Sequence, residues 1–155
     1  MSAELQTVDH SALKVNQTGI IVTVLVAFIG SFFSQAIWLL IPLLAIVLLL
    51  GTFAPQLALF KQLYFRVLKP AGLVKPRPVQ DRPEPHNFAQ GLGGVFLGIA
   101  TLFLYLATPT YGLVAAIGPA IALLVAVLAF VNLAFGYCLG CQIYYQLGKR
   151  GLIRA

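Results

Sequence analysis

The chain has 155 residues, of which 60% are hydrophobic and only 9% are charged. Soluble domains carry about 25% charged residues, so a soluble fold of this composition would expose large apolar patches and aggregate. The net charge of +6 does not indicate nucleic-acid binding, because a basic excess in the loops is a general property of membrane proteins.

Two long segments without Asp, Glu, Lys or Arg set the predicted topology. Residues 15–60 and 85–148 each have the length for two membrane crossings, since one crossing needs about 20 mostly apolar residues. The Lys and Arg residues fall outside both segments, at positions 14, 61–82, 149, 150 and 154. The positive-inside rule therefore predicts two helical hairpins, with both termini and every charged segment in the cytoplasm.

The first hairpin is expected to join spans at about residues 15–30 and 36–54. A short polar and flexible stretch that begins at Gly30 allows the turn between them. Pro42 predicts a kink in the second span rather than a break, because neighbouring groups in a bundle can satisfy the freed carbonyl. Residues 1–14 are expected to form a short polar tail.

The cytoplasmic loop, residues 55–87, begins with an amphipathic segment. Lys61, Arg66 and Lys69 gather on one side of a helical wheel, and apolar and aromatic side chains occupy the other. We expect an interfacial helix whose cations meet anionic lipid headgroups, each contributing on the order of 1 kcal/mol. The alternative is a continuation of the second span, which Pro55 disfavours. Five prolines between residues 70 and 85 then predict an extended, solvated linker.

The second hairpin is expected to join spans at about residues 88–107 and 113–135 through an uncharged turn. Gly91, Gly94 and Gly98 share one face of the third span, where another helix can approach closely. The predicted fold class is therefore an all-α integral membrane protein. It comprises four transmembrane helices in two hairpins and a cytoplasmic interfacial helix, within a single domain of residues 1–155.

Cys138 and Cys141 form the most recognisable chemical motif, a C-x-x-C pair at the end of the fourth span. The usual redox pair has its first cysteine at a helix N-terminus, whereas the C-terminal end of a span disfavours a thiolate. A break at Gly136 or Gly140 that starts a new helix would restore the favourable geometry. The sequence leaves two interpretations open: a functional redox-active dithiol, or two thiols that pack as small apolar side chains.

Polar residues near the same helix ends are candidates for a small binding pocket beside the cysteine pair. We expect His86, Gln90 and Asn132 to support the thiols. A set of His10, His86 and the two cysteines has the donor types of a zinc site, but its spacing is unlike that of a zinc finger. No metal and no cofactor are therefore expected. No carboxylate lies in any span, which argues against proton-coupled transport.

Three segments carry a family resemblance: Val15-Asn16-Gln17, the run HNFAQGLG from His86, and the run FGYCLGCQIYY from Phe135. Together they resemble a bacterial family of small four-helix membrane proteins that is catalogued only as a domain of unknown function. The likeness extends over residues 8–152, and the C-L-G-C element is its most specific part. The resemblance provides no activity to transfer. It implies an association of some relatives with thioredoxin-like or sulfurtransferase proteins, which favours thiol or sulfur chemistry.

The sequence leaves three interpretations of function, one of them enzymatic in character. The first is a cytoplasm-facing dithiol in thiol redox or sulfur handling, whose partner is a cytoplasmic thiol or sulfurtransferase protein. The second is a non-enzymatic subunit or assembly factor of a larger membrane complex. The third is small-solute permeation by an oligomer. The expected location is the bacterial cytoplasmic (inner) membrane, with a thylakoid membrane as the alternative.

Overall fold

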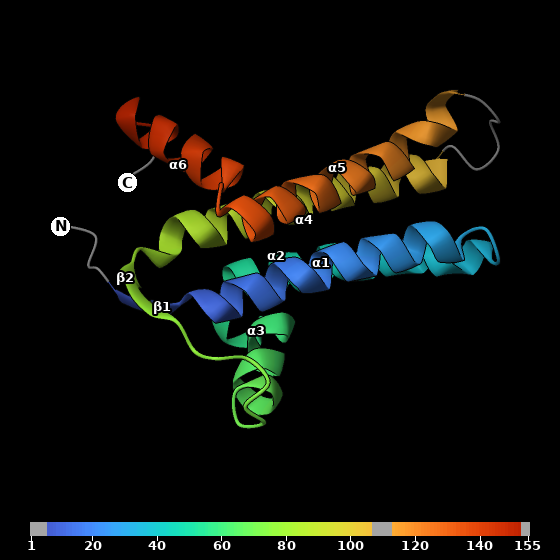
Figure 1. Ribbon diagram of the computed structural model, residues 1–155. Coiled ribbons are helices and arrows are strands. Elements are labelled where there is room, and N and C mark those ends of the chain that lie inside the picture. The colour runs from blue at the N-terminus through green and yellow to red at the C-terminus, as the bar shows by residue number, and fades with distance from the viewer. Residues whose placement is uncertain (1–5, 107–112, 153–155) are drawn as a thin grey trace.

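The computed structural model describes residues 6–106 and 113–152. Within these residues, four helical segments are long and apolar enough to cross a membrane. They are α1 (His10–Gly30), the segment Gln35–Phe53 that contains α2 (Leu40–Phe53), α4 (Pro83–Leu106) and the part Ala116–Phe135 of α5 (Leu113–Phe135). The four run side by side in one elongated bundle (Figure 1). The prediction of an all-α, multi-pass membrane protein is confirmed.

The centre of the bundle is built from small and branched apolar side chains. Helix α4 packs against both α2 and α5, and α5 also packs against α1. Leu48 of α2, Leu97 of α4 and Ala122 of α5 are almost fully buried in the shared core. Small residues predominate at such contacts because helices surrounded by lipid gain stability mainly from close van der Waals packing.

Two of the three glycines expected at a helix contact do face one. A Cβ atom added at Gly94 would lie 2.9 Å from the Leu49 Cγ atom of α2, and one added at Gly91 would lie 2.9 Å from the Thr52 Cγ2 atom. A Cβ atom at Gly98 would meet nothing within 4 Å. Gly98 therefore contacts no neighbouring helix among the described residues, and a contact of this position with a second copy of the protein stays a prediction.

A short helix follows Pro55, as predicted. It comprises α3 (Leu59–Leu63) and a π-helical turn over Tyr64–Leu68, and it projects sideways from the bundle (Figure 1). Its apolar side does not face lipid alone, because Tyr64 is fully buried and Phe60 packs against the core cluster. This side of the helix is thus partly occupied by the protein itself.

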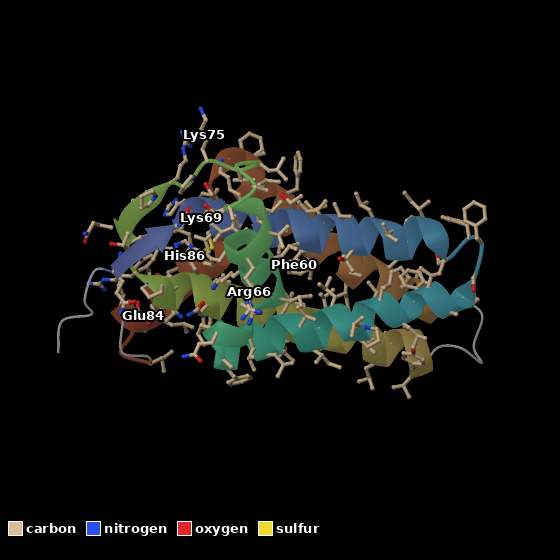
Figure 2. All side chains as sticks on the ribbon, turned by 90° about the horizontal axis from the view of Figure 1, so that it is seen from below. Phe60, Arg66, Lys69, Lys75, Glu84 and His86 are labelled. Atoms are coloured by element: carbon tan, nitrogen blue, oxygen red, sulfur yellow. A yellow bond between two sulfur atoms is a disulfide. The ribbon has the colours of Figure 1, made fainter. Side chains whose placement is uncertain are left out.

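The basic side of this helix is also partly exposed and partly in contact with the rest of the protein. Figure 2 shows Arg66 and Lys69 along it, and both side chains are exposed. Lys61 is half-buried and donates a hydrogen bond to the Asn87 Oδ1 atom at 3.2 Å. Desolvation by burial lowers the pKa of Lys61. Arg66 and Lys69 are therefore the exposed cations of this helix, and Lys69 also lies 4.0 Å from the Asp9 Oδ2 atom.

Two segments expected to be a free tail and a plain linker instead form a small sheet. Strand β1 (Gln6–Asp9) pairs antiparallel with β2 (Pro78–Asp81), with Thr7 opposite Gln80. The expectation was wrong here because two four-residue strands some 70 residues apart leave no periodic signal in the sequence. We call this pair the strap; it lies at the end of the bundle from which α3 projects (Figure 1).

Asp9 fastens the strap to its surroundings. Its side chain caps α1 by accepting a hydrogen bond from the Ser11 N–H at 3.0 Å, and it accepts another from the Arg77 N–H at 3.0 Å. It also accepts a hydrogen bond from the Tyr64 hydroxyl at 2.8 Å. Through this one carboxylate the strap, α1 and the helix after Pro55 are held together.

The C-terminal region turns sharply after the fourth span. Helix α5 ends at Phe135, and Gly136 follows with a φ angle of +69°, a conformation that glycine adopts without steric cost. Helix α6 (Leu139–Lys149) then leaves the bundle at an angle (Figure 1). The expected turn at residues 108–112 and the basic residue at position 154 lie outside the described residues.

Candidate functional site

The two cysteines lie at the start of α6 rather than at the end of α5. Cys138 is the N-cap residue of α6, and its Sγ atom accepts a hydrogen bond from the Cys141 N–H at 3.2 Å. A disulfide joins the two residues, whose Cα atoms are 5.2 Å apart. The chain breaks at Gly136, one of the two glycines at which the sequence allowed a break, and a new helix follows.

A close approach of two helices brings this pair to α4. Gly140 faces Ala89 of α4, and a Cβ atom added at Gly140 would lie 2.7 Å from the Ala89 Cα atom. The absence of a side chain at Gly140 therefore lets α6 reach α4 one turn from His86. Cys141 is buried at this contact, whereas Cys138 stays half-exposed.

His86 links the cysteine pair to an acid. Its Nδ1 atom lies 3.7 Å from the Cys141 Sγ atom, and its Nε2 atom lies 3.0 Å from the Asp81 Oδ2 atom. An ionised carboxylate only accepts hydrogen bonds, so the network assigns a proton to Nε2, and Nδ1 is the ring nitrogen that faces sulfur. Figure 2 shows His86 at the end of the bundle that carries the strap.

Asp81 is the centre of a wider hydrogen-bond network. It also contacts the His10 Nε2 atom at 3.2 Å and accepts a hydrogen bond from the Arg82 N–H at 2.8 Å. Desolvation by partial burial acts to raise the pKa of Asp81, but hydrogen bonds from His86, the Arg82 N–H and His10 outweigh it. The pKa of this carboxyl is therefore lowered, which keeps it ionised near neutral pH.

Three amide side chains lie close to the same point. Gln90 is buried, accepts a hydrogen bond from the Asn16 Nδ2 atom at 3.4 Å and donates one to the Leu48 carbonyl at 3.1 Å. Asn132, in the last turn of α5, lines the same cavities as Gln90 and Cys138. The structure thus brings together all five residues that the sequence suggested for this site, namely His86, Gln90, Asn132, Cys138 and Cys141.

The metal-donor set considered from the sequence comes together only in part. Donor atoms of His86, Cys138 and Cys141 lie within 4.8 Å of one another, whereas His10 groups with Asp81 and His86 instead. A thiolate rather than a disulfide sulfur is the ligand that metals bind. The disulfide form described here therefore does not offer the cysteines as ligands.

Asp81 is the site residue that sequence reasoning missed. A signal existed, because the chain has only four acidic residues and Asp81 precedes His86 by five positions. The stretch was interpreted as a solvated linker, in which an acid needs no explanation. Only the pairing of β2 with β1 fixes Asp81 beside the first turn of α4.

Comparison with known proteins gives a family but no activity. A family model described as "Domain of unknown function (DUF4395)" matches residues 8–149. No curated protein and no solved structure matches the chain.

Proposed function

The chain belongs to this family of unknown function, and we propose that it is a membrane-embedded thiol–disulfide exchange protein. One observation carries the proposal: a C-x-x-C pair lies at a helix N-terminus, and its Cys141 contacts a hydrogen-bonded His86–Asp81 pair. The location that goes with it is the bacterial inner membrane, with the site on the cytoplasmic side, where the basic segments are expected.

Cys138 is the residue that reacts with the substrate. It lies at the N-cap of α6, where unpaired N–H groups and the helix dipole stabilise negative charge, so its thiolate is favoured. It is also the more exposed of the two cysteines. A substrate thiolate attacks the Cys138 sulfur, the bond to Cys141 breaks, and a mixed disulfide forms between the substrate and Cys138.

Cys141 is the resolving residue, and His86 is its proton carrier. Reduction of the protein disulfide is completed when the second thiol of the substrate attacks the substrate sulfur of the mixed disulfide. This step releases the oxidised substrate and leaves Cys138 and Cys141 as thiols. In the reverse direction the Cys141 thiol gives its proton to the His86 Nδ1 atom and attacks the mixed disulfide. Burial of Cys141 keeps other thiols from competing for this step.

Trapping of the mixed disulfide tests the proposal. Full-length protein in mild detergent is mixed with an oxidised low-molecular-weight thiol, quenched with acid and analysed by mass spectrometry. We expect Cys141→Ser to accumulate an adduct on Cys138, because no resolving thiol remains. Cys138→Ser is the matched variant, and its buried Cys141 should form little adduct.

The contrary result is equally clear. Two thiols that only pack would resist labelling until the protein is denatured, and an oxidant would form no intramolecular disulfide after reduction. That outcome would reject thiol exchange and favour a non-enzymatic subunit of a larger complex. Partners would then be expected to co-purify from mild detergent.

A further inference from the structure

Cys138 lies where two cavities of different character meet. Five residues line both of them: Gln17, Ala89, Gln90, Asn132 and Cys138. One cavity continues past His10, Lys14 and His86, which belong to the charged end of the molecule. The other continues into the bundle past Ile20, Leu48 and Phe96. Cys138 thus borders one cavity that leads to the charged end and one that leads into the apolar bundle.

The apolar cavity indicates what kind of ligand it takes. Among the described residues that line it, none is charged, so a charged ligand would be buried without a partner. Its volume is about 90 Å³, several times the space that one water molecule needs. Its polar groups gather at the Cys138 end, and the rest of the lining is mostly apolar. A neutral, lipid-soluble molecule with a polar head fits this distribution.

The amides near the sulfur are suited to carbonyl oxygens. Asn132 lines both cavities, and its amide carries N–H groups that can donate hydrogen bonds to a ligand there. Gln90 is held in place by Asn16 and the Leu48 carbonyl. A flat head with carbonyl acceptors would find donors at this end of the cavity.

We propose that the apolar cavity binds a lipid-soluble quinone, which accepts electrons from the reduced Cys138–Cys141 pair. This inference rests on the proposed thiol exchange and names its second substrate. The Cys138 and Cys141 thiols lose two electrons and two protons and form the S–S bond. The quinone takes up both electrons and both protons and leaves as the quinol. A water-soluble dithiol then reduces the protein again through the polar cavity.

Gly93 offers a way to fill the apolar cavity without touching the sulfurs. A Cβ atom added there would lie 3.9 Å from both Leu48 Cδ1 and Val125 Cγ1, which is ordinary contact, and all three residues line the cavity. Gly93→Leu should therefore place its side chain in the space that the quinone head needs. Gly98→Leu is the matched control on the same helix, because Gly98 is exposed and has no neighbour within 4 Å.

The experiment uses the full chain, reduced and freed of reductant, in lipid nanodiscs. The probe is a fully substituted benzoquinone with a decyl tail, whose ring cannot add a thiol. We expect one quinol per disulfide formed, followed by absorbance and by thiol alkylation, and none with Cys138→Ser. The rate of disulfide exchange with dithiothreitol is measured on the same samples.

The ratio of the quinone rate to the dithiothreitol rate locates the binding site. Gly93→Leu should lower this ratio by at least about tenfold, the discrimination that one or two extra methyl groups produce in an apolar pocket. Gly98→Leu should leave it unchanged. An unaltered ratio in Gly93→Leu would overturn the cavity as the quinone site.

Failure of the inference and failure of the proposed function give different results. If the wild type exchanges with dithiothreitol but produces no quinol, the quinone proposal is rejected and thiol exchange stands. In that case the acceptor is a water-soluble disulfide that uses the polar cavity. If the wild type exchanges with neither reagent, both proposals are rejected.

Discussion

At the scale of single residues, two histidines share one carboxylate but have different neighbours. His86 and His10 both contact the Asp81 Oδ2 atom, at 3.0 and 3.2 Å. Only His86 also approaches sulfur, with its Nδ1 atom 3.7 Å from the Cys141 Sγ atom. A comparison of substitutions at the two histidines therefore separates proton transfer by His86 from a general effect on the Asp81 hydrogen-bond network.

We expect His86→Ala to slow thiol–disulfide exchange by about a hundredfold at neutral pH, the lower end of what a positioned acid–base group contributes. His10→Ala should slow it much less, because His10 does not reach the cysteines. Stopped-flow mixing with dithiothreitol, followed by alkylation of the released thiols, gives both rates. Equal losses in the two variants would show that the histidines act only through the packing of the strap.

At the scale of elements, the strap depends on an ionised Asp9. Desolvation acts to raise the pKa of this carboxyl, but hydrogen bonds from the Arg77 N–H, Tyr64 and the Ser11 N–H, together with the positive charge of Lys69, outweigh it. Its pKa is therefore lower in the folded protein than in the unfolded chain. Such a group stabilises the fold above its unfolded pKa, and this contribution is lost as pH falls through the folded pKa.

The expected pH dependence of the strap follows from the lowered pKa of Asp9. The strap should be held fully above about pH 5 and should loosen as pH falls below about 4, the ordinary value of an aspartate. Hydrogen exchange at the amides of β1 and β2, measured across this range, follows the loosening. Asp9→Asn should be less protected at neutral pH and should lose the part of the pH dependence that Asp9 contributes, whereas the part from Asp81 of β2, whose pKa is also lowered, should remain. Glu84→Gln, which alters an exposed acid outside the strap, should keep the dependence of the wild type.

The contact between α2 and α4 gives a second prediction at this scale. Gly94→Leu places a side chain against Leu48 and Leu49, where even a Cβ atom would lie within 3.3 Å of both. Overpacking of this kind costs about 1–3 kcal/mol. Thermal unfolding in detergent should show a lower transition temperature for Gly94→Leu and little change for Gly98→Leu. Equal stability of both variants would place the Gly94 face toward lipid.

At the scale of the whole molecule, the charged segments gather at one end. The start of α1, the strap, the helix after Pro55 and α6 all lie at the same end of the bundle (Figure 1). The described Lys and Arg residues lie in these segments or in the stretches next to them, whereas the turn that precedes Gln35, at the opposite end, is uncharged. The site with Cys138 is at the charged end, so the orientation of the bundle decides which compartment its thiols meet.

We predict that the charged end and both termini are cytoplasmic, because basic loops are retained on that side. Reporter fusions after Gln35 and after Ala155 should then report opposite compartments, with the second in the cytoplasm. A water-soluble maleimide on inverted vesicles should reach Cys138 after reduction. A periplasmic C-terminus would reverse the topology and with it the proposed source of the substrate thiol.

The sequence by itself determined the class of protein and indicated most of the residues that meet at the candidate site. Apolar segments of spanning length and the grouping of the basic residues predict two hairpins, because lipid requires each crossing segment to satisfy its own backbone hydrogen bonds. His86, Gln90, Asn132 and the two cysteines were identified because polar and thiol groups are rare in such segments. Gly91 and Gly94 were correctly expected at a helix contact, because glycine lets another helix approach closely.

Only the tertiary structure decided how these groups face one another. Whether Cys138 ends one helix or begins another depends on the positive φ angle of Gly136, which the sequence permits but does not require. Asp81 belongs to the site because two short strands pair across the chain, and Tyr64 is buried because Asp9 accepts its hydroxyl. These contacts join residues far apart in sequence, so their stability comes from the folded arrangement and leaves no local pattern from which to predict it.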